Sequence, residues 1–267
     1  MFKAFYGFTL NPFDKSISEN HAFKSRDHEQ MLSRLDYLKS TRGIGLFTAS
    51  PGMGKTYALR CFAQNLNPNL YQLSYICLST VSVNEFYQQF CHELGLDYCA
   101  QKATMFRNIQ ERLLHLLKEK RKTFILAIDE SQYLSHNVLR DIKMLMNTNF
   151  DSIDCFALIF IGQPYLCSTF EKPVHESLKQ RIVIHYNYEG LSPDESKNYI
   201  YTRIDLAGAS HSIIDESAVC AVANFCQGTP RLINSVMTNA LIVGAQLQSN
   251  VIDTEIILSA CNNLSLA

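Results

Sequence analysis

A glycine-rich segment, Ala49-Ser50-Pro51-Gly52-Met53-Gly54-Lys55-Thr56, constrains this 267-residue chain more than any other feature. It follows a short apolar run at residues 43–47, which predicts a strand, and it precedes a helical pattern over residues 55–65. A strand, a glycine loop and a helix opened by Lys-Thr together favour phosphate binding, because backbone N–H groups and the helix N-terminus converge on the anion. We therefore expect a phosphate loop here. The alternative is a glycine turn before an ordinary helix.

The residue types within this loop predict separate roles. Gly52 and Gly54 allow the chain to turn without Cβ clashes. Lys55 is expected to reach the β and γ phosphates of ATP, and the Thr56 hydroxyl is expected to ligate Mg²⁺. Ala49 stands where the motif usually has its first glycine, a departure that removes no phosphate-contacting side chain. The other residues expected to contact the nucleotide are Pro51, Met53 and Tyr57.

An acidic pair, Asp129 and Glu130, follows the apolar run Thr123–Ile128. That run has the length and composition of a strand buried on both faces of a parallel sheet. At the end of such a strand in a phosphate-loop sheet, Asp129 would hold Mg²⁺, usually through water, and would contact the nucleotide complex. Glu130 would polarise the water that attacks the γ-phosphate. The alternative is a solvated strand end, which is the commoner origin of an isolated Asp-Glu pair.

Strands and helices alternate along the first two thirds of the chain, which predicts an α/β fold with a parallel sheet. Further strands are predicted at residues 75–78, 156–161 and 182–186, and further helices at residues 26–38, 83–94, 105–118 and 138–146. From Ser192-Pro193-Asp194-Glu195 onward the pattern is helical, since Ser caps a helix and Pro suits its first position. We expect a nucleotide-binding domain at residues 1–190, with an arm at about 1–24, and a helical lid at 191–267, containing helices near 215–225, 231–246 and 253–262.

Composition excludes several classes of protein. The 24 basic and 25 acidic residues give a net charge of -1, so nucleic acid or membrane binding would need a local patch or many subunits acting together. Nine scattered cysteines include no C-x-x-C pair, which favours reduced thiols in a cytoplasmic protein over a metal site. No run of about 18 apolar residues and no signal peptide is visible, so we expect no membrane association.

These motifs together resemble the AAA+ ATPases, and most closely the ExeA-type group with the transposition regulators TnsC, TniB and MuB. The likeness covers nearly the whole chain. Its marks, in order, are Tyr6-Gly7-Phe8, Asn11-Pro12-Phe13, the phosphate loop, Asp129-Glu130-Ser131-Gln132, Ile161-Gly162-Gln163-Pro164, Gln180-Arg181-Ile182 and Gly228-Thr229-Pro230-Arg231-Leu232-Ile233-Asn234. The phosphate loop is the one specific mark, and the order and spacing of the set add to it.

The resemblance implies three further catalytic residues. Gln163 matches sensor 1, which orients water against the γ-phosphate; the alternative is a turn residue at a strand end. Arg181 matches the arginine finger that acts on a neighbouring subunit; the alternative is a salt bridge, with Lys179 and Arg140 as other candidates for the finger. Arg231 matches sensor 2, which couples the lid to the nucleotide; the alternative is an exposed arginine at a helix start. The resemblance also implies that the arm residues Asn11, Pro12 and Phe13, with Phe8, border the adenine, although plain core packing explains them equally well.

The resemblance implies a DNA-dependent ATPase that forms a ring or filament on double-stranded DNA and directs a transposase, with or without a target-selection protein. A second interpretation is an ExeA-like secretion ATPase, but that type carries a membrane segment and a cell-wall-binding domain after the ATPase, and this chain ends at Ala267. A third is an ATP-binding module without hydrolysis, which the presence of Glu130, Gln163 and Arg181 disfavours.

Contacts to DNA are expected in the loop at residues 101–104, where TnsC-like proteins follow the DNA backbone. Lys102 and Thr104 can each contact phosphate, and neither would read bases. The alternative is an exposed loop without such a role. A second basic cluster, Lys118, Lys120, Arg121 and Lys122, is typical of a solvated helix end, where lysine also suits the helix dipole.

Overall fold

The computed structural model describes residues 2–148 and 152–264, which form two compact units. The α/β unit comprises Gln30–Pro51 and Lys55–Tyr188, and the helical unit comprises the described residues up to Glu29, Gly52–Gly54 and the described residues from Glu189 onward. The α/β fold with a parallel sheet and a C-terminal helical region is confirmed. The N-terminal arm groups with the helical unit, which differs from the expected 1–190 boundary, because its Phe8 and Phe13 are buried in the helical core.

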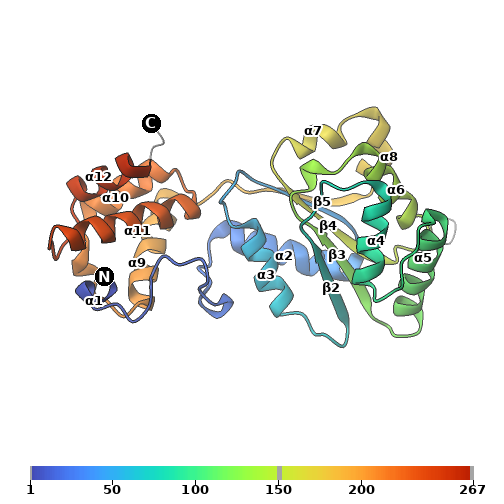
Figure 1. Ribbon diagram of the computed structural model, residues 1–267, viewed down its shortest axis with the longest axis horizontal. Coiled ribbons are helices and arrows are strands. Elements are labelled where there is room, and N and C mark those ends of the chain that lie inside the picture. The colour runs from blue at the N-terminus through green and yellow to red at the C-terminus, as the bar shows by residue number, and fades with distance from the viewer. Residues whose placement is uncertain (1, 149–151, 265–267) are drawn as a thin grey trace. The chain divides into compact units, whose positions relative to one another are not determined.

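A five-stranded parallel sheet organises the α/β unit, in the order β2-β3-β4-β1-β5 (Figure 1). Its strands are β1 (Gly43–Thr48), β2 (Tyr71–Ile76), β3 (Thr123–Ile128), β4 (Phe156–Gly162) and β5 (Ile182–Asn187). Every residue of β1 and β4, and all but the first of β3, is buried. Continuous apolar sequences therefore form these three central strands, because both of their faces are covered.

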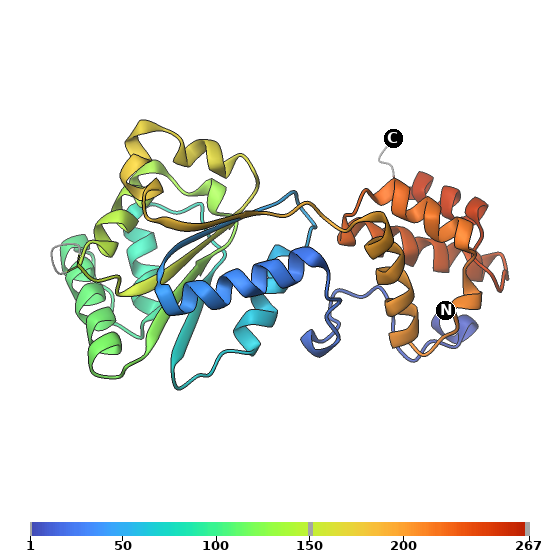
Figure 2. The same cartoon turned by 180° about the vertical axis from the view of Figure 1, so that it is seen from behind.

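Helices cover both faces of this sheet (Figures 1 and 2). One face carries α2 (Arg26–Thr41) and α3 (Lys55–Gln64), and the other carries α4 (Val83–Glu93), α5 (Lys102–Lys118) and α6 (His136–Met146). The shorter helices of the unit are α7 (Leu166–Phe170) and α8 (Glu176–Lys179), with 3₁₀ turns at Ser131–Tyr133 and Pro173–His175. A Cβ added to Gly45 would lie 2.8 Å from a Leu38 methyl, so the absence of a side chain lets α2 pack closely on β1.

Five helices with a continuous apolar core build the helical unit. They are α1 (Phe2–Tyr6), α9 (Pro193–Leu206), α10 (Glu216–Cys226), α11 (Pro230–Gln246) and α12 (Thr254–Leu264), with 3₁₀ turns at Glu19–His21 and His211–Ile213. The predicted start of α9 is confirmed. Ser192 Oγ accepts from the Glu195 amide at 3.1 Å, and the Glu195 carboxylate accepts from the Ser192 amide at 2.9 Å, so the two residues cap each other.

Two predicted boundaries are wrong. The strand predicted at residues 75–78 is β2, which covers Tyr71–Ile76 and pairs with β3 from Tyr71 opposite Thr123 to Ile76 opposite Ile128. It is an edge strand with polar Gln72 and Ser74, so apolar content alone misplaced it. The helix predicted from residue 105 begins at Lys102, whose first turn has no apolar residue packed in the core before Met105.

Two further observations concern the cysteines and the apolar character of the helices. The nine cysteines are free thiols, and five of them are buried. Among residues 2–148 and 152–264, no helix combines the length and apolar character needed to cross a membrane.

Candidate nucleotide site

The phosphate loop connects β1 to α3, as its sequence predicts. Gly52 and Gly54 have φ values of 84° and 97°, in the left-handed region that glycine adopts without steric cost. Lys55 opens α3 and is 8% exposed. Its ammonium donates to the backbone oxygens of Ala49 at 2.8 Å and Ser50 at 3.2 Å, so the charge lies over the loop that would receive phosphate.

A hydroxyl and a carboxylate meet beside this loop. Thr56 Oγ1 donates to Asp129 Oδ2 at 2.6 Å, and the Glu130 amide donates to Asp129 Oδ1 at 2.8 Å. Asp129 follows β3 and is 4% exposed. Sequence analysis expected these two side chains to share Mg²⁺, and the structure brings them together. A hard hydroxyl and carboxylate oxygen pair suits Mg²⁺, which keeps water and phosphate oxygens as its other ligands.

Tyr75 is a neighbour of this pair that the sequence analysis missed. Its hydroxyl donates to Asp129 Oδ2 at 2.9 Å from the adjacent strand β2. Burial of the hydroxyl, and then its hydrogen bond to Asp129, raise the pKa of Tyr75 well above its usual range. The phenol therefore remains a donor at neutral pH. Its position depends on the register of β2 against β3, in which Tyr75 lies opposite Ala127, two residues before Asp129.

Glu130 sits on a strained turn at the end of the same strand. Its φ is 49°, a left-handed conformation that is uncommon for a residue with a side chain. Ser79 Oγ donates to the Glu130 carbonyl oxygen at 2.8 Å, and Gln132 Nε2 donates to the Glu130 carboxylate at 2.5 Å. The residue is exposed, so the anchored carboxylate remains accessible to water.

Gln163 lies directly after β4, next to the strand that carries Asp129. The Gln163 backbone N–H donates to Gln132 Oε1 at 3.1 Å. The Gln132 side chain therefore connects the Glu130 carboxylate to the Gln163 backbone. The structure thus brings the expected base and the expected sensor 1 residue to one edge of the sheet.

Arg181 precedes β5 and is half-buried. Its guanidinium lies 3.9 Å from the Asp154 carboxylate, a long ion pair with a partly exposed partner. Its backbone oxygen accepts from the Ile44 amide at 3.2 Å, which joins it to β1. The other two candidates for the finger, Lys179 and Arg140, are exposed, and the Arg140 guanidinium donates to Asn137.

Arg231 is the second residue of α11, and it contacts Gly52, which belongs to the same helical unit. Its amide donates to the Gly52 oxygen at 3.3 Å. A Cβ on Gly52 would lie 2.9 Å from the Arg231 Cβ, so only glycine leaves room for this approach. The side chain of Arg231 is exposed, which leaves its guanidinium available.

Comparison with known families finds a domain that contains the same nucleotide-site residues. The family model described as "AAA domain" matches residues 38–170, which include the phosphate loop, Asp129 and Glu130. Over these residues the chain is similar to AAA domains. The flanking sheet and helices match the AAA+ phosphate-loop fold.

One curated relative extends the likeness beyond the AAA domain. The chain is homologous to General secretion pathway protein A of Aeromonas hydrophila, with 30% identity over 245 residues. The matched region is 91% of this chain and 44% of that protein, so the chain spans less than half the length of the relative.

Two solved structures share the fold of nearly the whole chain. Cdc6p from Pyrobaculum aerophilum has a TM-score of 0.73 and 15% identity, over 96% of this chain and 71% of that chain. The Aeropyrum pernix ORC1 protein, solved in complex with DNA, has a TM-score of 0.68 and 15% identity, over 95% of this chain and 68% of that chain. At such identities the likeness concerns the fold.

The arm residues expected near adenine lie in the helical unit, outside the AAA domain match. Phe13 is 4% exposed and belongs to the helical core, and Pro12 is also buried. Asn11 is half-buried, and its side-chain oxygen accepts from the Phe13 amide at 3.2 Å. These contacts account for the three residues by packing, which was the alternative interpretation, and their place beside adenine stays a prediction.

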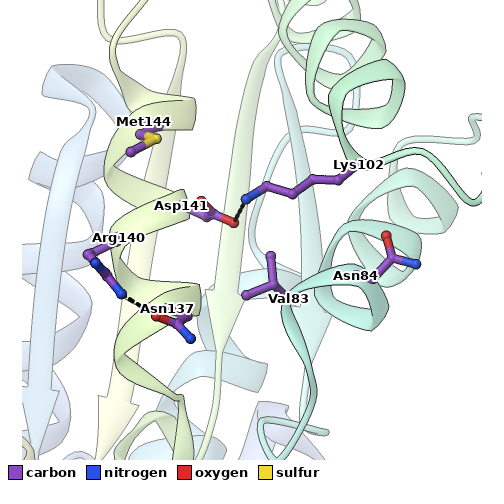
Figure 3. Close-up of a pocket in the computed structure, with 7 residues that line it drawn as sticks. All are labelled: Val83, Asn84, Lys102, Asn137, Arg140, Asp141 and Met144. Carbon is purple, nitrogen blue, oxygen red and sulfur yellow. Dashed lines mark hydrogen bonds and ion pairs between the residues drawn. The ribbon is translucent and has the colours of Figure 1, made fainter.

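The two residues expected to contact DNA lie in the first turn of α5. Figure 3 shows Lys102 beside Asp141. The Lys102 ammonium is half-exposed, forms a 2.5 Å ion pair with the buried Asp141 carboxylate of α6, and lies 5.7 Å from the Tyr87 ring centroid. Thr104 donates to the Gln101 side chain at 3.3 Å. The pocket around Lys102 has a volume of about 450 Å³ and is lined by Val83, Asn84, Lys102, Asn137, Arg140, Asp141 and Met144.

Proposed function

We propose that this chain is an ATP-hydrolysing AAA+ regulator of transposition that assembles on double-stranded DNA. One observation carries the hydrolytic part. The Thr56 hydroxyl and the Asp129 carboxylate lie 2.6 Å apart, and the next residue, Glu130, presents an anchored and exposed carboxylate. That constellation follows the glycine loop inside the AAA domain and supports both Mg²⁺–ATP binding and activation of water.

Each residue of the site has a defined part in this proposal. Lys55 neutralises charge on the β and γ phosphates, and Thr56 with Asp129 holds Mg²⁺, which supplies positive charge next to the γ-phosphate. Glu130 accepts a proton from the attacking water, and Gln163 orients that water. Arg181 of a neighbouring copy and Arg231 would complete the charge stabilisation, which makes a homo-oligomer part of the proposal.

The DNA part rests on two kinds of support. The motif order resembles the TnsC, TniB and MuB transposition regulators, and the fold is shared with a protein solved in complex with DNA. Lys102 and Thr104 are the proposed backbone contacts, one or two per subunit. A net charge of -1 then requires many subunits to bind DNA firmly, which favours a ring or filament. A transposase, with or without a target-selection protein, would be the partner, and nine free thiols suit the cytoplasm.

A second candidate is an ATPase of the secretion pathway. The 30% identity to General secretion pathway protein A, over 91% of this chain, supports it directly. Both candidates bind and hydrolyse ATP, so the response to DNA separates them.

Adding duplex DNA and ATP to the protein therefore distinguishes the two candidate functions. We expect large rings or filaments in electron micrographs, a matching rise in light scattering, and binding that is insensitive to sequence and falls steeply with salt. The Lys55→Ala variant is the matched control, because it should not assemble with ATP. A protein that binds ATP but stays monomeric with DNA across low salt concentrations would exclude the transposition proposal and leave the secretion candidate.

A further inference from the structure

A buried glutamine, Gln132, lies between the two residues proposed to handle the attacking water. It belongs to the 3₁₀ turn Ser131–Tyr133 that follows Glu130, and it is 9% exposed. Its amide nitrogen donates to the Glu130 carboxylate at 2.5 Å, and its amide oxygen accepts from the Gln163 backbone at 3.1 Å. Gln132 therefore uses both ends of its side chain in the site, while its own position is protected from solvent.

The surroundings of Gln132 hold its amide in one orientation. A Cβ on Gly162 would lie 2.6 Å from Gln132 Oε1, so glycine is required for the amide to reach β4. Ser131 is buried, and its hydroxyl donates to the Ile128 oxygen at 2.6 Å, which ties the start of the turn to β3. The side-chain assignment is also determined by chemistry, because a carboxylate accepts only from the NH₂ end and a backbone N–H donates only to the oxygen end.

We propose that Gln132 is a positioning residue for ATP hydrolysis, acting by holding the Glu130 carboxylate in a set relation to Gln163. This inference rests on the proposed function, in which Glu130 is the base. Glu130 is an exposed side chain with several rotatable bonds, and it needs an anchor to keep one geometry. Misplacing a base by about 1 Å can lower the rate on the order of 10²-fold. Gln132 can therefore affect the rate of hydrolysis without contacting the substrate.

The first test replaces Gln132 with methionine, which preserves length and removes both hydrogen bonds. We expect kcat for ATP hydrolysis to fall by about 10-fold or more, with KM and the directly measured ATP affinity changed less than about two-fold, because an anchor for the base acts on the chemical step. Gln72→Met is the matched control. Gln72 is half-buried on the edge strand β2, and its side-chain amide donates to the Glu93 backbone oxygen at 3.5 Å.

The second variant, Gln132→Glu, tests whether the effect of Gln132→Met comes from a folding defect. The new carboxylate still accepts from the Gln163 amide, but it cannot donate to Glu130 and repels it. We expect a loss of kcat at least as large as in Gln132→Met, with an ATP affinity within about two-fold of that of the parent.

A double-variant cycle distinguishes positioning from a structural role. In a Glu130→Gln background, measured under single-turnover conditions with excess protein, adding Gln132→Met should change the rate less than about two-fold, because the residue that Gln132 positions is already disabled. An equal fold-loss in both backgrounds, or parent-like hydrolysis by Gln132→Met, would overturn the inference. If Glu130→Gln itself hydrolyses ATP at the parent rate, the proposed base is wrong and both proposals fall together.

Discussion

The Thr56 hydroxyl lies 2.6 Å from Asp129 Oδ2, joining the first turn of α3 to the end of β3. This contact places the two oxygens that we propose as Mg²⁺ ligands beside the phosphate loop. Asp129→Asn keeps the shape of the side chain and removes its charge. We expect ATP hydrolysis to fall by about 10²-fold or more and the Mg²⁺ concentration for half-maximal rate to rise.

A Mg²⁺ titration of the hydrolysis rate checks this expectation, and nucleotide binding in EDTA serves as the control, because it should change little. Asp36→Asn is a matched variant on the exposed side of α2, where Asp36 pairs with Lys39. A parent-like Mg²⁺ profile in Asp129→Asn would remove Asp129 from the proposed metal site.

Glu130→Gln should separate binding from hydrolysis. The substituted amide can still accept from Gln132 Nε2, so the turn and the ATP affinity should be preserved. The loss of a general base should lower the rate by about 10²–10⁴-fold. Equilibrium binding of a fluorescent ATP analogue, measured beside phosphate release, tests both halves. We also expect ATP-dependent assemblies of this variant to last longer than those of the parent, and hydrolysis at the parent rate would contradict the assignment.

Arg181 and Lys55 should complement each other across subunits if Arg181 is a finger. Arg181→Ala and Lys55→Ala are each expected to be inactive, and a mixture should recover activity because one subunit supplies the nucleotide site and the other the arginine. Such fingers contribute about 10³–10⁵-fold in related phosphoryl transfer. Within the chain, the Arg181 guanidinium lies 3.9 Å from the carboxylate of the half-exposed Asp154, so the stability of Arg181→Ala should be measured beside its activity to exclude a folding defect.

Activity of the mixture, measured over several ratios after oligomers are verified by light scattering, is the readout. Lys179→Ala tests the other candidate two residues earlier, and it should keep activity alone if Arg181 is the finger. An inactive mixture at every ratio would assign Arg181 to its structural ion pair.

Lys102→Ala should weaken DNA binding on every sequence, because a phosphate contact carries no base information. The substitution also leaves the buried Asp141 carboxylate without its 2.5 Å partner, so a loss of DNA binding could follow from a fold defect. The double variant Lys102→Ala/Asp141→Asn removes both charges and resolves this. We expect it to recover thermal stability but not DNA affinity, as measured by fluorescence anisotropy at several salt concentrations. Recovery of DNA affinity in the double variant would refute a direct contact by Lys102.

The buried His175 should make stability depend on pH. Burial, and then the nearby His136, Lys172 and Arg140, lower the pKa of His175 below its usual range, and its Nε2 lies 2.7 Å from His136 Nδ1. The unfolded chain therefore binds this proton more readily, so stability is full above about pH 6.5 and falls below it. We expect a slope of up to about 1.4 kcal/mol per pH unit just below pH 6.5. Denaturant unfolding at successive pH values should show a shallower slope for His175→Gln than for the parent, and equal slopes would contradict the proposed cause.

Sequence patterns predicted best where one local rule decides the structure. The strand Thr123–Ile128 is confirmed residue for residue, because burial on both faces demands an uninterrupted apolar run. The edge strand β2 was misplaced, since one open edge tolerates Gln72 and Ser74, and the helix start at Lys102 was missed because its first turn lacks a packed apolar residue. The loop, Asp129 and Glu130 followed from motif and spacing.

Other features of the site depend on contacts between segments far apart in the chain. The sequence motif includes Gln132 but predicts no role for it. Its two partners, Glu130 and Gln163, follow different strands, so the proposed role depends on the hydrogen bonds that connect them. Tyr75 likewise depends on the register of β2 against β3. The roles of Gln163, Arg181 and Arg231 came from family resemblance and stay predictions, since the structure gives their positions and not their contacts with nucleotide.

The left-handed backbone conformation of Glu130 means that the residue best for stability differs from the residue needed for activity. At a φ of 49°, glycine or asparagine would relieve a strain on the order of 1 kcal/mol. A library randomised at this codon and screened only for heat resistance should therefore enrich Gly and Asn and discard the carboxylate. The thermostable variants selected in this way would be inactive. Stabilisation of this protein by consensus design or directed evolution therefore needs a screen for ATP hydrolysis beside the selection for heat resistance.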